Sequence, residues 1–385
     1  MPAPKNNKAI SLYEINGFGH LKPALSFIEQ MKHYPVDTEA WDIYADESGE
    51  TLLDRDSFYN RISTNPSTVK IWNYLTNGDA FTKYFRKPYH WLDAYPLKHL
   101  ATRIKNAHQQ NPNTIFFSTH FTPANIAART LPHQKVFVYV TDIHPHPVWA
   151  VKKKNLHYLV PLDYTKYSLV QYGIDPDNIH IASFPIHPQL IKGQTTRHKN
   201  RIKNLSSEKT TDILIISGGA GTGQIQMQNL LKTFAAPAHA HQINIKFLAS
   251  TRKLRDALKD THVKQGLPVN SVEIDVYKPD ILYKSMRWAE VLITKAGGDI
   301  TFEALAEGLP VYTLKDVGDH ERINREYLQK AGVSRQLESS VYPWELIHHD
   351  LLTGRLKKMA QASNKLGKFH RDSNLHDVLW EQMGW

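Results

Sequence analysis

Lys295-Ala-Gly-Gly-Asp-Ile-Thr-Phe-Glu-Ala-Leu-Ala-Glu-Gly-Leu-Pro310 is the stretch that says most about how this chain folds. It follows the apolar run Val291-Leu-Ile-Thr294, so the pattern predicts a buried strand, a glycine turn and a helix. Gly297 and Gly298 let the backbone approach a ligand, and the first N–H groups of the helix attract phosphate. Glu303, one turn further on, can accept hydrogen bonds from a ribose. The alternative is a plain tight connection with a solvated glutamate.

A second glycine cluster follows the apolar run Asp212-Ile-Leu-Ile-Ile-Ser217 and precedes a helical stretch at 224–233. Its members are Gly218, Gly219, Gly221 and Gly223. Each glycine costs conformational entropy on folding, so a turn alone does not account for them. We interpret the cluster as a second diphosphate loop. It is not a dinucleotide fingerprint, because no acidic partner of the NAD type clearly follows it.

Apolar β-branched runs alternate with helical segments along the chain, which is typical of parallel sheets covered by helices on both faces. The expected strands are 9–15, 114–117, 135–140, 212–217, 243–248, 272–276, 291–294 and 311–314. The segment 192–204 is polar and basic without an apolar period, which predicts a linker. The sequence thus predicts an α/β fold of two Rossmann-like, doubly wound domains facing a cleft, at residues 1–190 and 205–365.

Composition narrows the class of protein. A chain of 385 residues with 41% hydrophobic content can bury two cores, and the absence of cysteine excludes disulfides and thiolate metal sites. No segment approaches the roughly 20 apolar residues of a membrane-spanning helix, and no apolar leader follows Met1, so we expect a cytoplasmic protein. The net charge of +10 attracts anionic lipid, nucleic acid or phosphorylated substrates.

Basic and aromatic residues are concentrated between Phe58 and Gln110. They are Tyr59, Arg61, Lys70, Trp72, Tyr74, Lys83, Tyr84, Phe85, Arg86, Lys87, Tyr89, Trp91, Tyr95, Lys98 and Arg103. This mixture suits contact with an anionic membrane surface, and it would also suit stacking on single-stranded nucleic acid. Burial of the aromatics in the first domain is the third interpretation. Nucleic-acid binding leaves the glycine turns unexplained, so we expect none.

Three polar residues follow predicted strands of the first domain. His20 lies at a turn that opens a helix, where its imidazole can take a proton from an acceptor hydroxyl. Asp142 follows the strand 135–140 and either caps the next segment or serves the acceptor site. His120 follows the strand 114–117 and would open onto the same edge, although an exposed loop histidine also fits.

The histidines His144, His146 and His157 lie close to Asp142 in sequence and suggest zinc. Prolines at 145 and 147 interrupt a helical ligand face, and no His-Glu-x-x-His pattern is present. We therefore expect no metal site there.

Five motifs, taken in chain order, resemble the monogalactosyldiacylglycerol synthase and processive diacylglycerol glycosyltransferase family. They are Asn16-Gly-Phe-Gly-His20, Thr141-Asp142 with His146 and Trp149, Gly218 to Gly223, Lys295 to Pro310, and Asp319-His-Glu-Arg-Ile-Asn324. More distantly, the chain is similar to the transferase that adds N-acetylglucosamine to the lipid-linked peptidoglycan precursor. The resemblance implies a GT-B architecture, with acceptor recognition in the first domain and the nucleotide sugar in the second. It also implies that the C-terminal residues 366–385 return to the first domain.

The resemblance assigns several residues by motif. It maps the family's motif histidine onto His20 and matches His146 and Trp149. We expect His120, His146 and Trp149 on the acceptor side and Gly19 on the donor side. It also puts His320, Glu321 and Asn324 beside the donor sugar. The chain departs from the family at Ala296, Ile300 and His320, where the family usually has proline, a small hydroxyl residue and glutamine. Asp299 adds a negative charge near the expected diphosphate.

We therefore expect an enzyme that moves a hexose from a UDP-sugar to a hydroxyl acceptor. The expected acceptor is a lipid such as diacylglycerol, reached from the inner face of a membrane. His20 and Asp142 are the expected catalytic residues, and the resemblance implies inversion at the anomeric carbon. No cofactor or metal is expected. Asp54-Arg-Asp56 has the shape of a metal-binding Asp-x-Asp motif, but no strand pattern surrounds it. A UDP-sugar 2-epimerase and a catalytically weak UDP-sugar sensor are the alternative functions.

Overall fold

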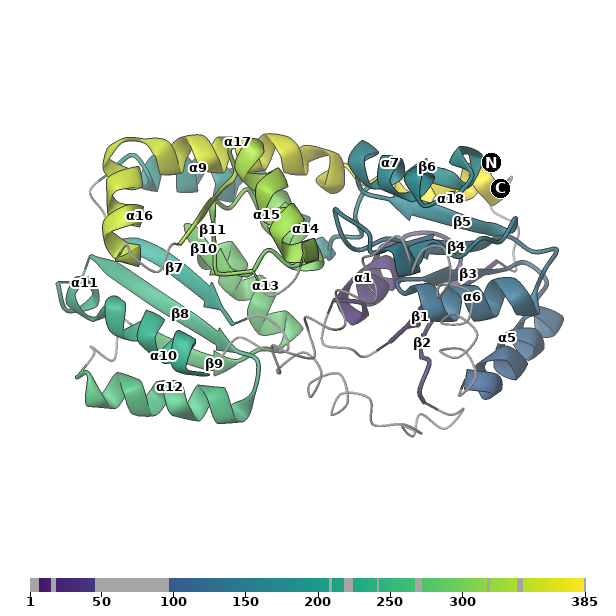
Figure 1. The fold of residues 1–385 in the computed structure, drawn as a ribbon, viewed down its shortest axis with the longest axis horizontal. Coiled ribbons are helices and arrows are strands. Elements are labelled where there is room, and N and C mark those ends of the chain that lie inside the picture. The colour runs from purple at the N-terminus through teal and green to yellow at the C-terminus, as the bar shows by residue number, and fades with distance from the viewer. Residues whose placement is uncertain are drawn as a thin grey trace. The chain divides into compact units, whose positions relative to one another are not determined.

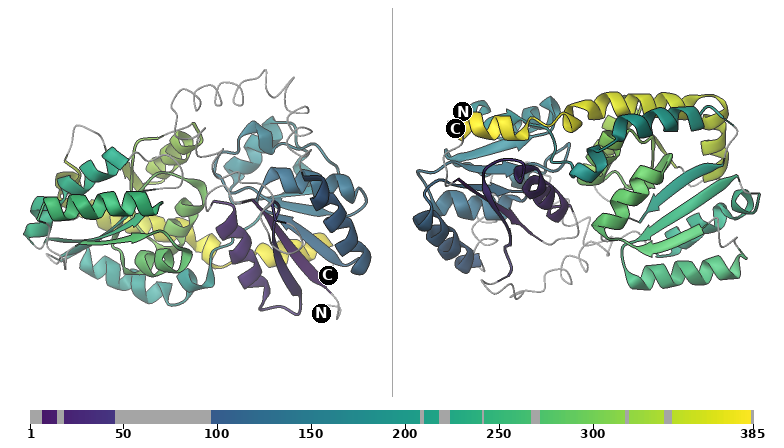
Figure 2. Two further views of the ribbon diagram at one scale, coloured as in Figure 1. Left: turned by 90° about the horizontal axis from the view of Figure 1, so that it is seen from below. Right: turned by 180° about the vertical axis from the view of Figure 1, so that it is seen from behind.

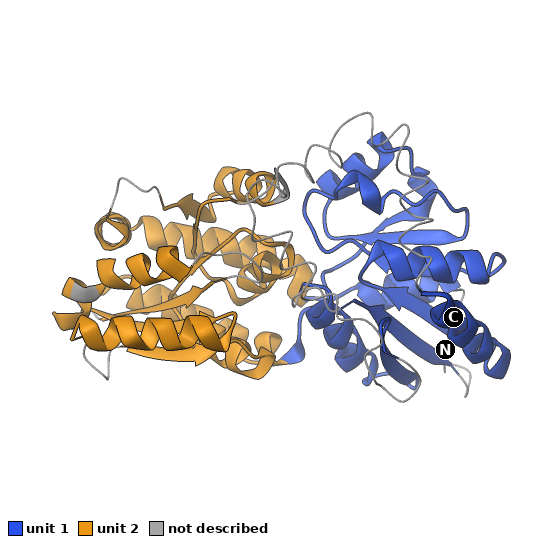
Figure 3. Ribbon diagram, turned by 60° about the horizontal axis from the view of Figure 1, so that its bottom comes forward, with its two compact units in different colours: residues 1–188, 372–385 blue, residues 189–371 orange. Residues whose placement is uncertain are grey.

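The computed structural model describes residues 7–14, 19–45, 97–207, 210–217, 224–240, 242–266, 272–316, 319–337 and 342–383, apart from the side chains at 235, 319 and 320 (Figure 1). The chain divides into two compact units (Figure 3). The first unit contains residues 1–188 and 372–385, and the second contains 189–371. Each unit is a sheet covered by helices on both faces (Figure 2).

The first unit has six parallel strands in the order β2-β1-β3-β4-β5-β6. Its elements are β1 (Lys8–Tyr13), α1 (Leu21–Met31), β2 (Asp37–Asp42), α5 (Lys98–Gln110), β3 (Thr114–Ser118), α6 (Phe121–Thr130), β4 (Val136–Tyr139), η3 (Pro147–Trp149), β5 (Leu156–Val160), α7 (Asp163–Gln171), η4 (Pro176–Asn178), β6 (Ile179–Ile181) and α18 (Leu375–Met383).

Successive side chains of a strand point to opposite faces of the sheet. Because helices cover both faces, every side chain of the central strands is buried. Phe116 belongs to the core that includes residues of α5 and α6. The next residue, Phe117, stacks on Phe27 of α1, with ring centroids 3.9 Å apart. The uninterrupted apolar run that predicts β3 in the sequence is therefore the result of two cores, one on each side of the sheet.

The second unit has six parallel strands in the order β12-β11-β10-β7-β8-β9. Its elements are α9 (Gln194–Asn204), β7 (Thr211–Ile216), α10 (Gln224–Thr233), α11 (Ala235–His239), β8 (Ile243–Ala249), α12 (Arg252–Lys264), β9 (Val272–Val276), α13 (Pro279–Trp288), β10 (Val291–Thr294), α14 (Gly298–Glu307), β11 (Val311–Thr313), α15 (Asp319–Lys330), β12 (Ser334–Gln336), α16 (Pro343–Leu352) and α17 (Arg355–Arg371). A short helix, α8 (Pro188–Ile191), spans the division between the units.

The predicted linker at 192–204 is wrong, because most of it is the helix α9 of the second unit. Its inner face is built from paired charges. Arg201 is 3% exposed and donates to the Glu307 carboxylate at 3.0 Å and to the Ala289 carbonyl at 3.0 Å. Arg197 contacts the same carboxylate at 2.6 Å. Since a buried helix face of this kind contains few apolar residues, its hydrophobic pattern resembles that of a solvated segment.

The chain returns to the first unit at residue 372, after α17, whereas the sequence analysis divided it at 366, inside that helix. Helix α18 is held in the first unit by Asn374, which accepts from the Ser183 N–H at 2.8 Å and donates its own N–H to the Ser183 hydroxyl at 2.9 Å. Leu375 and Leu379 bury its apolar side.

The predicted fold class, two Rossmann-like α/β domains, is confirmed, and the cleft expected between them stays a prediction. Within the described part of the chain, no helix is long and apolar enough to cross a membrane.

Candidate functional site

Polar side chains gather at the carboxyl end of the first sheet. Glu14 follows β1, His20 directly precedes α1, His120 follows β3, and Asp142 follows β4. The rings of His20 and His120 lie edge to face with their centroids 4.7 Å apart. The Trp149 ring lies 6.1 Å from the first and 6.2 Å from the second. The structure thus brings together four residues that the sequence analysis selected separately, and it adds Glu14.

His20 has a defined tautomer. Its Nδ1 lies 2.6 Å from the Thr119 carbonyl oxygen, and the Thr119 hydroxyl donates back to the His20 carbonyl at 2.8 Å. A carbonyl oxygen only accepts, so Nδ1 carries the proton and Nε2 keeps its lone pair. The pKa of His20 is lowered to about 4, mainly by burial and also by His120, while Glu14 and Asp142 oppose this shift. At neutral pH the side chain is therefore an uncharged base.

His120 is 8% exposed, so the interpretation as an exposed loop histidine is wrong. Its Nδ1 lies 3.1 Å from Glu14 Oε2 and 3.3 Å from the Thr122 backbone nitrogen at the start of α6. Glu14 is itself 1% exposed. Because Nδ1 accepts the Thr122 N–H, its contact with Glu14 is an ion pair only when the imidazole is protonated. Glu14 was missed because the strand was expected to run over 9–15, whereas β1 ends at Tyr13 and leaves Glu14 at the edge of the sheet.

His144 and His146 take local roles in the first unit. His146 caps the short helix η3, with its Nδ1 3.4 Å from the Val148 nitrogen. His144 faces α7, where its ring nitrogens lie 3.2 Å from the Tyr164 hydroxyl and 3.5 Å from that of Tyr172. Trp149 is 3% exposed and is part of the core. Among the described residues, no three His, Asp or Glu side chains are arranged to hold a metal, and Asp54-Arg-Asp56 lies outside them.

The strand, turn and helix expected around Gly297 are present in the second unit. Gly297 is the residue before α14, and its N–H donates to the Lys295 carbonyl at 2.9 Å. Asn324 of α15 is fully buried and donates to the Ala296 carbonyl at 3.0 Å. The side chain that the resemblance puts beside the donor sugar therefore also fixes the turn.

Three carboxylates belong to α14, and one of them, Glu307, pairs with the arginines of α9. Glu303 is 3% exposed, so the interpretation as a solvated glutamate is wrong. Asp299 accepts a hydrogen bond from the Ile300 N–H at 2.8 Å, which brings its negative charge to the first turn of the helix. That contact uses one of the N–H groups that a phosphate would otherwise find free.

The remaining donor residues are described in part. Glu321 of α15 acts electrostatically on Lys295, a buried lysine that the sequence analysis did not select. Gly19 has no heavy atom within 4 Å of the place where a Cβ would stand. The side chain of His320 and the cluster Gly218, Gly219, Gly221 and Gly223 lie outside the described residues.

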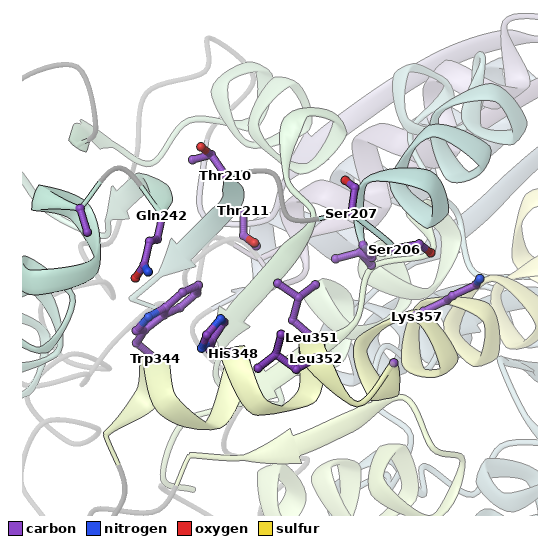
Figure 4. Close-up of a pocket in the computed structure, with 13 residues that line it drawn as sticks. Ser206, Ser207, Thr210, Thr211, Gln242, Trp344, His348, Leu351, Leu352 and Lys357 are labelled. Carbon is purple, nitrogen blue, oxygen red and sulfur yellow. The ribbon is translucent and has the colours of Figure 1, made fainter.

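Two pockets belong to the second unit. A pocket of about 720 Å³ lies at the amino ends of the strands, near Thr211, and is lined by Trp344 and His348 of α16 among others (Figure 4). A pocket of about 400 Å³ lies at the carboxyl ends of β8 and β9. It is lined by Arg252, Arg255, Asp275, Val276, Lys278 and Ile281. The smaller pocket is therefore on the same edge of the sheet as the glycine turn. That edge is where ligands of parallel α/β sheets bind.

Known proteins resemble the chain in sequence and in fold. Residues 55–186 match the family model described as monogalactosyldiacylglycerol (MGDG) synthase. The chain is 28% identical over 401 aligned residues to a processive diacylglycerol beta-glucosyltransferase of Bacillus pumilus, covering 98% of this chain and 95% of that relative.

Two solved structures share the fold over almost the whole length. The UDP-GlcNAc 2-epimerase of Neisseria meningitidis bound to UDP-GlcNAc matches with a TM-score of 0.60 and 14% identity, covering 98% of this chain and 99% of the other. MurG of Acinetobacter baumannii matches with a TM-score of 0.56 and 11% identity, covering 98% and 99%. At these identities the structures show the fold alone, which is of the GT-B type. The family resemblance that the motifs predicted is confirmed by the sequence matches.

Proposed function

We propose that this chain, a relative of the diacylglycerol glycosyltransferases and of MGDG synthase, is a glycosyltransferase that moves a hexose from a UDP-sugar to a hydroxyl group. The acceptor we propose is a lipid such as diacylglycerol, because the similar protein of Bacillus pumilus is named for that acceptor. The single observation that carries the proposal is the fixed, uncharged His20 beside two carboxylates at the carboxyl end of the first sheet.

His20 acts as the general base. The acceptor hydroxyl gives its proton to Nε2 while its oxygen bonds to the anomeric carbon and the bond to UDP breaks, so that UDP leaves with the electron pair. Inversion follows from this single displacement. The imidazolium that forms keeps its Nδ1–H bond to the Thr119 carbonyl, and Glu14 and Asp142 both favour its charge. The two carboxylates therefore offset part of the burial penalty that the imidazolium meets when the proton arrives.

The second unit holds the UDP-sugar in this proposal. The glycine turn lets the nucleotide approach the start of α14, where backbone N–H groups face the diphosphate. Glu303 accepts hydrogen bonds from the ribose, and Glu321 with Asn324 lies beside the sugar. Such a site requires no metal ion and no further cofactor. Membrane attachment through the basic and aromatic stretch from Phe58 to Arg103 belongs to the same proposal.

Part of that stretch has another role. The Arg103 guanidinium carbon lies 3.9 Å from the centroid of the Trp41 ring, so this cation packs on the first unit. Residues 58–96 lie outside the described residues. In this proposal the attachment depends on the other cations of the stretch, which are those between residues 61 and 87 and the exposed Lys98.

Glu303→Ala tests the donor site. We expect UDP to bind about 10- to 100-fold more weakly to this variant, because a charged acceptor contributes roughly 1.5–3 kcal/mol per hydrogen bond. Isothermal titration with UDP measures the change. Glu345→Ala, which removes an exposed glutamate from α16, is the matched control and should bind UDP normally. Equal UDP affinity in both variants would refute the ribose assignment.

A UDP-sugar 2-epimerase remains the second candidate because one solved epimerase shares the fold over 98% of this chain. An epimerase would convert UDP-GlcNAc to its 2-epimer without any acceptor, whereas a transferase releases UDP only when a hydroxyl acceptor is present. Product analysis with and without dispersed diacylglycerol separates the two. Tight binding of the UDP-sugar without either product would favour a sensor.

A further inference from the structure

Lys295 is a buried cation at the edge of the second sheet where the donor is expected. It directly follows β10, which lies between β7 and β11 in the middle of the sheet. The residue is 6% exposed. Its backbone is fixed, because the carbonyls of Lys295 and Ala296 accept hydrogen bonds from the Gly297 N–H and the Asn324 side chain. The side chain that carries the ammonium group is therefore attached to a rigid turn.

Burying the charged form of a lysine in this place costs free energy. Burial lowers the pKa of Lys295, and the Glu321 carboxylate on α15 opposes that shift. Lysine is seldom buried without a partner that offsets its lost hydration. Glu321 is the one carboxylate whose charge acts on it among the described residues, and the net effect still disfavours the ammonium ion. A further negative charge at this position would stabilise it.

The turn also lacks other positive charge. Lys295 is the only basic residue between 291 and 314 in the sequence. The start of α14 carries about half a positive charge from the aligned peptide dipoles. Asp299 offsets that partial charge, since its carboxylate accepts from the Ile300 N–H within the first turn. A diphosphate placed there would therefore need positive charge in addition to the N–H groups that α14 leaves free.

We propose that the Lys295 ammonium binds the diphosphate of the nucleotide sugar and offsets the charge that UDP gains as it leaves. This inference rests on the proposed function. When the bond between the anomeric carbon and the diphosphate oxygen breaks, the electron pair stays on that oxygen, and UDP carries one more negative charge than the diphosphate had in the sugar nucleotide. The ammonium group neutralises this charge without a metal ion. Lys295 is therefore a donor-binding residue that becomes more important as the leaving group forms.

The test compares a ligand that has the diphosphate with one that lacks it. UDP and uridine are titrated by calorimetry against the full-length protein and against Lys295→Met, which keeps most of the side-chain volume. We expect UDP to bind about 10- to 100-fold more weakly to the variant, as charge-assisted hydrogen bonds to phosphate are lost. Uridine affinity should change by less than about threefold, since it makes no such contact.

Lys315→Met is the matched control. Lys315 is an exposed lysine just after β11, on the same edge of the same sheet, and its removal should leave the affinity for both ligands unchanged. Glu321→Gln separates ligand binding from ion pairing. If Lys295 only pairs with Glu321, this second variant should reproduce the loss seen in Lys295→Met. UDP lacks the sugar beside which Glu321 is proposed to lie, so if Lys295 binds diphosphate, UDP affinity should stay the same or rise in Glu321→Gln.

Each result supports or overturns a distinct statement. A loss of UDP affinity alone in Lys295→Met supports the inference. Equal losses for UDP and uridine would mean that the lysine only maintains the turn, and unchanged UDP affinity would mean that it does not contact the ligand; either result overturns the inference. Failure of the unmodified protein to bind UDP would overturn the proposed function itself.

Discussion

Gly367 controls how closely α17 packs against α14, the helix that begins at the glycine turn. A Cβ atom at this position would lie 1.9 Å from the Leu305 carbonyl oxygen and 2.3 Å from the carbonyl carbon. The two helices are also joined by Arg371, which donates to the Ala306 carbonyl at 3.0 Å. We predict that Gly367→Ala destabilises the second unit and weakens UDP binding, because α14 must move.

The size of the effect follows from the geometry. Side-chain Cβ atoms essentially never lie within 3.0 Å of such an atom, so the backbones must separate by about 1 Å in a tightly packed region. Overpacking of this kind costs roughly 1–3 kcal/mol, and the contact here is with a rigid backbone, which favours the upper end. Alanine regains about 1 kcal/mol of helix propensity over glycine. The expected net loss is about 2 kcal/mol, or about 4–8 °C in melting temperature for a domain of this size.

Differential scanning calorimetry and UDP titration of the same samples measure both effects. Gly19→Ala is the stability control, since no heavy atom lies within 4 Å of its Cβ position. A Gly367→Ala protein that melts at or above the temperature of the parent would refute the packing argument. Normal UDP affinity in a clearly destabilised variant would separate the position of α14 from the donor site.

Three further predictions concern the first unit. His20→Ala should lower turnover about 100- to 10,000-fold with little change in UDP affinity, while His144→Ala, which removes a histidine that faces α7, should not. Because the pKa of His20 is lowered to about 4, its active uncharged form persists as pH falls below 6.5. Turnover should therefore decline only near pH 4. A decline centred near pH 6.5 would contradict the burial argument. The protein should sediment with anionic vesicles but not with neutral ones, and the binding should weaken as the salt concentration rises. Exchange of Lys83, Arg86 and Lys87 for glutamate should reduce this binding. Equal binding by both proteins would exclude that surface.

The sequence alone determined the architecture. Strands such as 291–294 and 272–276 are uninterrupted or alternating apolar runs, and in parallel sheets that pattern follows directly from burial between helix layers. The turn at Gly297 was also predicted from the sequence, because a glycine pair between a strand and a helix allows a tight turn and a close approach of the backbone to a ligand. Helix α9 was not predicted because its buried side has no apolar pattern. That side is formed by arginines paired with Glu307.

Only the tertiary structure decided which polar residues act together. Glu14 and His120 are over a hundred positions apart in sequence, yet β1 and β3 are hydrogen-bonded neighbours, so both residues leave the sheet at the same edge. The same holds for Lys295 and Glu321, which belong to different helix–strand units. A sequence shows where each strand ends, but strand order decides which ends are adjacent. Burial then determines whether a carboxylate, an imidazole or an ammonium at that edge keeps its ordinary charge.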